Sequence, residues 1–243
     1  IWMYQVNSEI LAVWKKHENI DAPFMKRIPL FYTKPKTNCL LYVGFNPSFN
    51  EKFMSKLKAE SVKSGKSYSF DYNTKTEFSE ENINEVAEYE AGASIPGHEF
   101  FYEPYFKKLK KVSERIGFGD NFENIDLFFM RETNSKEVKK SINYGKDGKE
   151  LNQFAEDQLA ISEKIIKEAK PIVIIVINAA SSNIYKNKFL CNQEKVDKKY
   201  GLYYHKIGER NVPTILCGMI SGQRALDNFS LERMIWQINK YCK

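Results

Sequence analysis

The sequence predicts an α/β protein in which helices cover both faces of a four-stranded parallel sheet, giving a three-layer αβα sandwich. Short apolar runs alternate along the chain with longer segments of helical periodicity. One run, Ile172–Ile177, is continuously apolar, as expected of a central strand that is covered on both faces. Strands separated by helices are expected to pair in parallel through right-handed crossovers.

Four apolar runs are predicted to form the sheet. The first run ends at a glycine and turns through Asn-Pro-Ser, which indicates a buried strand that leads directly into a helix. The predicted strands are, in chain order, Cys39–Gly44, Ile125–Met130, Ile172–Ile177 and Val212–Cys217.

Helices are expected between and after these strands. The segment Leu151–Ala169 carries apolar residues at close to helical spacing, and Pro171 follows its end. The other predicted helices are Ile10–Lys16, Ser48–Lys58, Tyr105–Ile116 and Ser230–Tyr241.

The length of 243 residues suits one large domain with a full core and is too short to require two. We therefore expect a single domain over residues 1–243. Residues 61–97 differ in composition, because Ser, Lys, Asn and Glu predominate and aliphatic residues are few. This stretch is predicted to be an insertion or lid containing one acidic helix, Glu80–Glu90, since loops of this length within a domain are usually functional or disordered.

The composition excludes several classes of protein. Hydrophobic residues at 42% and charged residues at 28% are ordinary for a soluble globular chain. No apolar run reaches the roughly 18 residues of a membrane span, and the first residues lack the pattern of a secretory signal. No P-loop or redox-cofactor motif is present, so no cofactor is expected. The net charge of +6 permits contact with a polyanion.

The cysteines indicate a cytoplasmic protein with reduced thiols. They are widely scattered and have no paired spacing for zinc, so no metal site is expected. The four are Cys39, Cys191, Cys217 and Cys242.

The functional site is predicted at the carboxyl ends of the strands, because ligands bind in the crevice there in open α/β sheets. The loops that follow the four strands are small, polar or glycine-bearing, which suits a pocket. They are Gly44–Ser48, Met130–Asn134, Asn178–Ser182 and Gly218–Arg224.

Each candidate residue also has an ordinary structural explanation. Asn46 and Pro47 are typical of a helix start, with Asn as the N-cap and Pro in the first turn. Arg131 is as well suited to pair with a carboxylate as to line a pocket. Asn178 is typical of a hydrogen-bonded amide at a buried strand end, and Ser221 of a hydroxyl that caps a turn.

The order and content of the loops resemble the uracil-DNA glycosylase superfamily, and within it the mismatch-specific uracil/thymine branch. That family has a Gly-x-Asn-Pro motif after its first strand, which Gly44-Phe45-Asn46-Pro47 matches. A strand ending in Arg-x-Thr is similar to Arg131-Glu132-Thr133, and Lys-Pro before an apolar strand resembles Lys170-Pro171. The resemblance covers roughly residues 39–240 without the insertion.

This resemblance implies hydrolysis of the N-glycosidic bond of a base that is flipped out of DNA. Asn46 would be the catalytic residue and hold the attacking water, although its amide cannot deprotonate that water. Either Phe45 or Phe53 would supply the ring on which the base stacks. The other substrate-binding residues would be Gly44, Pro47, Ser48, Arg131 and Asn178.

The loop after the last predicted strand departs from the family pattern. Family members have His or Asn followed by Pro-Ser, whereas Met219 and Ile220 stand in the first two of these positions here. Methionine can neither donate a charged hydrogen bond nor stabilise an anion. The residues expected to contact DNA from this loop are Ser221, Gly222, Gln223 and Arg224.

Because of this departure, three functions stay open. The first is a DNA-base glycosylase with Asn46 as the water-holding residue. The second is a noncatalytic protein that binds nucleic acid or a nucleobase. The third is a hydrolase of a small nucleoside-like ligand, over which the insertion would close.

Overall fold

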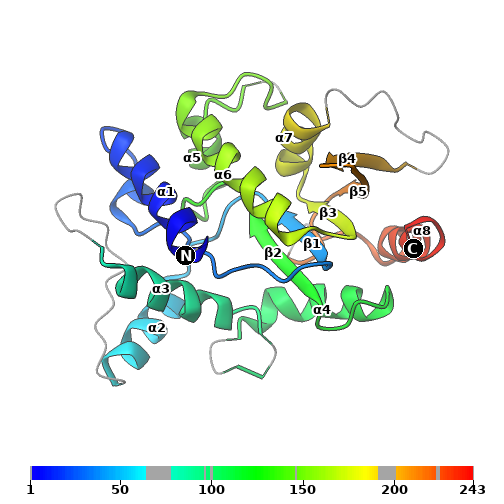
Figure 1. The fold of residues 1–243 in the computed structure, drawn as a ribbon, viewed down its shortest axis with the longest axis horizontal. Coiled ribbons are helices and arrows are strands. Elements are labelled where there is room, and N and C mark those ends of the chain that lie inside the picture. The colour runs from blue at the N-terminus through cyan, green and yellow to red at the C-terminus, as the bar shows by residue number, and fades with distance from the viewer. Residues whose placement is uncertain are drawn as a thin grey trace.

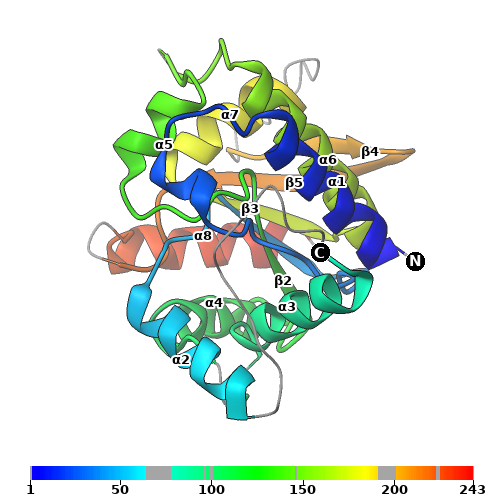
Figure 2. The same cartoon turned by 90° about the vertical axis from the view of Figure 1, so that its left-hand side faces the viewer.

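The computed structural model describes residues 2–63, 78–95, 97–98, 101–145, 147–190, 201–222 and 225–242. A five-stranded sheet lies at the centre of these residues, and helices cover both of its faces (Figures 1 and 2). The α/β class and the mostly parallel sheet are therefore confirmed. No helix of the described part of the chain is long and apolar enough to cross a membrane.

The sheet has five strands, so the predicted number of four is wrong. The strand order is β2-β1-β3-β5-β4. Strands β2, β1, β3 and β5 are parallel to one another, and β4 is antiparallel to β5. The strands are β1 (Leu40–Gly44), β2 (Phe122–Asp126), β3 (Val173–Ile177), β4 (Tyr203–Ile207) and β5 (Arg210–Cys217).

The unpredicted strand, β4, lies at the edge of the sheet. It is joined to β5 through Gly208 and Glu209, and Gly208 has a φ of +61°, which suits a two-residue hairpin turn. Among its residues only His205 is buried. The central strands are predicted from their continuous apolar runs. An edge strand that is mostly exposed to solvent has no such run, and β4 is therefore not predicted.

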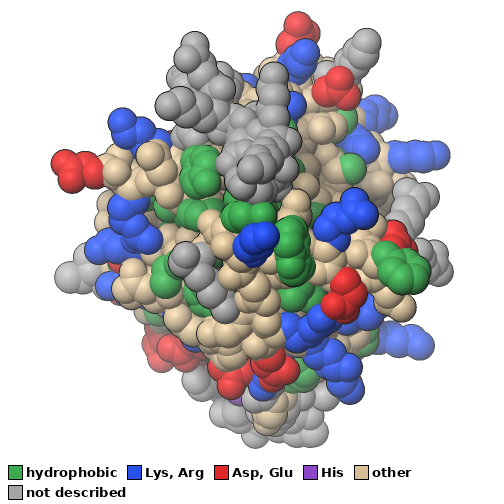
Figure 3. Space-filling model, turned by 90° about the vertical axis from the view of Figure 1, so that its right-hand side faces the viewer, with side chains coloured by type: hydrophobic (Ala, Val, Ile, Leu, Met, Phe, Trp, Pro, Cys, Tyr) green, Lys and Arg blue, Asp and Glu red, His purple; other side chains and the backbone are tan. Residues whose placement is uncertain are grey.

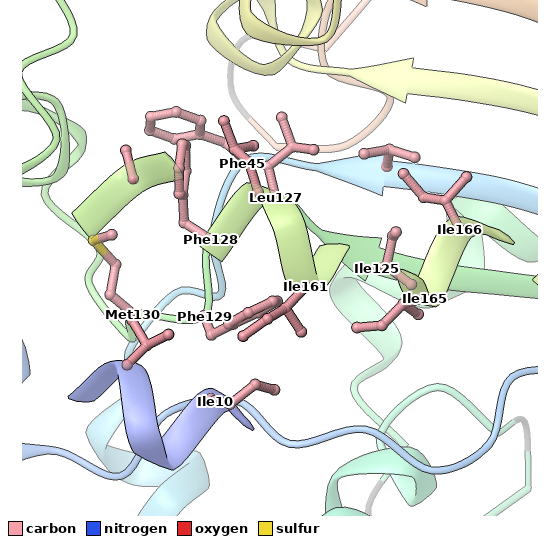
Figure 4. Packing of buried hydrophobic residues seen from close by; sticks show 14 of the residues in the cluster. Ile10, Phe45, Ile125, Leu127, Phe128, Phe129, Met130, Ile161, Ile165 and Ile166 are labelled. Carbon is pink, nitrogen blue, oxygen red and sulfur yellow. The ribbon is translucent and has the colours of Figure 1, made fainter. Parts of the chain in front are cut away.

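Strand β2 ends earlier than predicted, at Asp126 instead of Met130. The apolar run after it, Leu127–Met130, is completely buried but lies beyond the paired residues (Figure 4). There the N–H of Phe129 donates to Gln158 Oε1 at 2.9 Å. The N–H groups of Leu127 and Phe128 still donate to the carbonyl oxygens of Gly44 and Phe45. The whole run is buried in the core to which α6 (Gln153–Ala169) contributes, which explains why it is apolar.

One face of the sheet packs through Leu41, Val43, Ile174 and Val176 into the larger core. Five α-helices contribute side chains to this core, in addition to Phe24 and Met25 of a short 3-10 helix, and one of the five is the acidic helix that is expected within residues 61–97. The helices are α1 (Trp2–Lys16), α3 (Glu80–Gly92), α5 (Ser135–Ser141), α6 and α7 (Ala179–Phe189). Residues 64–77, also part of the predicted insertion, lie outside the described residues.

The other face packs through Leu40, Tyr42 and Ile175 against α4 (Glu103–Arg115) and α8 (Asn228–Tyr241). The remaining helical segments are η1 (Pro23–Lys26) and α2 (Glu51–Lys63). Because side chains alternate along each strand, both cores are built from the same short segments.

Candidate functional site at the carboxyl ends of β1 and β2

The loops that follow β1 and β2 are joined by hydrogen bonds. The N–H of Glu132 donates to the carbonyl oxygen of Pro47 at 3.0 Å. The N–H of Phe49 donates to Thr133 Oγ1 at 3.1 Å, and this hydroxyl donates to the carbonyl oxygen of Phe49 at 2.8 Å. The two loops that carry the Gly-x-Asn-Pro and Arg-x-Thr sequences therefore lie side by side.

The amide of Asn46 is fixed between these loops. Its Nδ2 lies 3.0, 3.1 and 2.7 Å from the carbonyl oxygens of Pro47, Met130 and Glu132. Three carbonyl acceptors identify this atom as the nitrogen, because the amide oxygen cannot donate. Its Oδ1 accepts no hydrogen bond from any described residue and is thus available to a ligand or a water.

The predicted alternative role of Asn46 as a helix N-cap is not observed. Helix α2 begins at Glu51, and Asn50 Oδ1 accepts the N–H of Phe53 at 3.1 Å. Asn50 therefore caps this helix, and the segment from Asn46 to Phe49 has no regular secondary structure.

A buried carboxylate lies beside this loop, at a position that sequence reasoning missed. Asp126 is the last residue of β2 and pairs in register with Gly44, the last residue of β1. A Cβ atom at Gly44 would overlap Asp126 Oδ1, so only glycine leaves room for this carboxylate. Asp126 is 7% exposed, and its carboxylate has no hydrogen-bond partner among the described residues.

Burial without a partner disfavours the charged carboxylate and raises the pKa of Asp126 to about 7. Two tyrosines, Tyr32 and Tyr105, are close enough for the charge of Asp126 to raise the pKa of each, in addition to the larger effect of burial. The backbone N–H of Asp126 donates to Tyr32 Oη at 3.0 Å. Burial therefore brings the pKa of this carboxyl close to neutral pH, in a setting shared with two tyrosines.

Arg131 is held in the interior of the protein. It is 3% exposed and forms an ion pair with Glu90 of α3. Its Nε donates to the carbonyl oxygen of Ile28 at 3.0 Å, while Glu90 Oε2 accepts the N–H of Phe31 at 3.1 Å. Burial lowers the pKa of Arg131 to about 9, which leaves the guanidinium charged at neutral pH. Of its two predicted roles, these contacts match the pairing with a helix carboxylate.

The two predicted stacking rings have different surroundings. Phe45 is 5% exposed and packs edge-to-face against Phe128, with 5.4 Å between ring centroids. It belongs to the larger core, where it lies near Leu127 and Phe128 (Figure 4). Phe53 is half-buried on α2 and lies 5.4 Å from the ring of Tyr102. Of the two rings, only that of Phe53 is accessible for stacking.

Asn178 has a structural role at the end of β3. Its Oδ1 accepts the N–H of Ala180 at 2.8 Å, which caps α7, and its φ is +93°. Ser182 Oγ contacts the carbonyl oxygen of Cys217 at 3.1 Å and so joins the start of α7 to the end of β5. These contacts match the ordinary structural explanation of Asn178.

The loop after β5 lies two strands away from β1, roughly 10 Å along the sheet. Ser221 is buried, Gly222 is exposed with a φ of +87°, and Met219 forms a bridge with Ala225. Gln223 and Arg224 lie outside the described residues. A groove of about 240 Å³ follows the end of β5, but Met219 does not line it.

The structure thus places Gly44 against Asp126, and the chain continues from Gly44 to the fixed amide of Asn46, the partly buried Pro47 and the exposed Ser48. Within the described residues, no group of three or more His, Cys, Asp or Glu side chains is placed to hold a metal ion. Neither a protein-family model nor a curated protein matches the sequence of this chain.

Proposed function

We propose that this protein hydrolyses the N-glycosidic bond of a nucleobase in DNA, at the carboxyl ends of β1 and β2. The observation that carries this proposal is the fixed amide of Asn46, whose nitrogen is held by three carbonyl oxygens while its oxygen faces no protein donor. An acceptor held in one orientation positions a water for attack in one direction.

Asp126 supplies the proton chemistry that an amide lacks. Gly44 pairs with Asp126, and Asn46 follows Gly44 by two residues, so the proposal assigns both side chains to one site at this corner of the sheet. With a pKa of about 7, Asp126 has a substantial ionised fraction at neutral pH and also accepts a proton readily. A general base of this kind is required because the uncharged amide cannot deprotonate water.

In the proposed reaction, water attacks the anomeric carbon of the sugar and transfers a proton to the Asp126 carboxylate. The bond between that carbon and the base nitrogen breaks, and its electron pair leaves with the base. The base anion then takes up a proton from solvent. The half-buried ring of Phe53 is the proposed stacking surface for the base.

A second function, binding of nucleic acid or a nucleobase without hydrolysis, is favoured by Met219. Its side chain offers no donor at the end of β5, where a group that stabilises the leaving base would be expected. A protein of this kind would use the same corner of the sheet but release no base.

Single-turnover incubation with uracil-containing and mismatched duplexes distinguishes these functions. The hydrolase produces alkali-labile abasic sites, and Asn46→Ala and Asp126→Asn each lower the rate about a hundredfold or more. Bound duplex without any abasic site identifies the noncatalytic protein, especially if binding weakens steeply with salt. Release of base from free nucleosides but not from DNA identifies a hydrolase of small ligands.

A further inference from the structure

Helix α8 carries a row of aromatic and basic side chains that the proposed hydrolysis does not use. Phe229, Arg233, Trp236 and Lys240 are spaced four, three and four residues apart, which places them in one line along the helix. We refer to these four residues as the α8 row. The helix packs on the sheet through its opposite side, where the buried residues are Met234, Ile235 and Ile238.

The two rings of the α8 row are exposed to solvent. Phe229 is 87% exposed and Trp236 is 53% exposed, more than any other large hydrophobic side chain of the described residues. The outer side of a helix packed on a sheet is normally polar. Two large rings at these positions therefore indicate contact with a partner.

The row is also positively charged. Arg233 has no salt-bridge partner among the described residues, and Lys240 Nζ lies 4.8 Å from the centroid of the Trp236 ring. The one acidic residue within α8, Glu232, is neutralised by two hydrogen bonds from Arg115, at 2.6 and 2.5 Å. In Figure 3, which faces the side of the molecule where α8 lies, hydrophobic and basic side chains are interspersed.

Helix α4 extends this positive surface, because Arg115 connects its C-terminal end to α8. Lys111 and Lys108 lie one and two turns before Arg115, are exposed, and form no salt bridge with any described residue. An anionic partner that follows the α8 row would therefore find further cations beside it.

The groove at the end of β5 adjoins the row. Arg233 lines this groove of about 240 Å³ together with Gly218, Leu226 and Ser230. Pockets that enclose a complete drug-sized ligand have volumes of about 300 Å³ or more, so this groove accommodates only part of a larger ligand. Arg233 thus belongs both to the exposed row and to the groove.

We infer that the α8 row binds single-stranded nucleic acid. The two rings, about 10 Å apart along the helix axis, offer faces on which bases stack, and the cations offer contacts to phosphates. A membrane-surface helix would turn its broad apolar side to the lipid, whereas that side of α8 is packed on the sheet. The inference stands independently of the proposed hydrolysis.

The test is binding of a fluorescently labelled oligothymidylate of about 12 nucleotides, followed by fluorescence anisotropy. Trp236→Ala and Phe229→Ala are each expected to weaken binding about fivefold or more, since base stacking on an aromatic ring contributes strongly. The logarithm of the association constant falls linearly with the logarithm of the salt concentration, and Arg233→Ala is expected to make this fall less steep by about 0.7. All three side chains are at the surface, so the variants are expected to fold normally.

Matched controls come from α1, which lies on the opposite face of the sheet. Tyr4→Ala removes an aromatic side chain that is 37% exposed, and Lys15→Ala removes an exposed cation. Both should bind like the unmodified protein. Loss of binding in the ring variants without loss in these two controls assigns the binding to the α8 row, whether or not the protein releases a base from DNA.

Three results would overturn the inference. One is the absence of saturable oligonucleotide binding at about 50 mM salt, and another is unchanged affinity of the two ring variants. The third is evidence that something else binds the α8 row. This would be either self-association in sedimentation that both ring variants abolish, or binding to phosphatidylserine vesicles without binding to the oligonucleotide.

Discussion

Gly44 and Asp126 end two neighbouring strands in register, and the carboxylate of Asp126 occupies the space where a side chain at position 44 would lie. The backbone of β1 and the carboxylate of β2 therefore approach each other at the corner where Asn46 is fixed. The same contact explains why glycine is needed at position 44, although its φ is not in the left-handed region.

Gly44→Ala is expected to lower the free energy of unfolding by about 1–3 kcal/mol, because the new methyl group overlaps Asp126. Urea denaturation measures this loss. In a protein that already carries Asp126→Ala, Gly44→Ala should lower the free energy of unfolding by clearly less. Equal losses in both backgrounds would contradict the close approach.

The pKa of Asp126, raised by burial to about 7 from its usual 3.8, makes stability depend on pH. Between these two values the folded protein binds the proton more tightly than the unfolded chain, so stability falls as the pH rises. The fall amounts to at most about 4 kcal/mol, at 1.36 kcal/mol for each unit of pKa difference.

Asp126→Asn removes this dependence, because an amide has no charge to bury. Unfolding titrations from about pH 4 to 8 should show a smaller decrease for this variant than for the unmodified protein. A variant that loses stability with pH as steeply as the unmodified protein would show that another group is responsible.

The buried ion pair between Arg131 and Glu90 fixes the loop after β2 to α3. Glu90→Gln or Arg131→Met leaves one charge buried without its partner and is expected to cost about 3–5 kcal/mol. The double variant should regain part of this loss, which a double-mutant cycle in thermal or urea unfolding detects. Strictly additive losses would mean that the two charges do not interact.

The central strands could be predicted from the sequence because they are buried on both faces. β1 and β3 are continuous apolar runs, and their observed bounds differ from the predicted ones by one residue or less at each end. The run at Leu127–Met130 is equally buried, but the strand register of β2 ends at Asp126, so an apolar run alone predicts the wrong bounds for this strand. The edge strand β4 has no such run.

The candidate site was predictable only in part. Parallel strands end at the same edge of a sheet, so the meeting of the loops around Asn46 and Glu132 follows from the order of elements. The role of Asp126 depends on the strand register, which places a glycine beside it. The partner of Arg131 lies in α3, far from it in sequence, and nothing local to Arg131 indicates Glu90.

The measurement that tests the central claim most directly is the single-turnover rate of base release for Asn46→Ala beside Asn178→Ala. Both variants remove an amide from the carboxyl edge of the sheet, but Asn178 caps α7 with a φ of +93°, so alanine there is expected to cost about 1 kcal/mol or more of stability and to leave the rate unchanged. We predict a loss of about a hundredfold or more for Asn46→Ala alone. Equal rates for the two variants would contradict the role of Asn46 in positioning the attacking water.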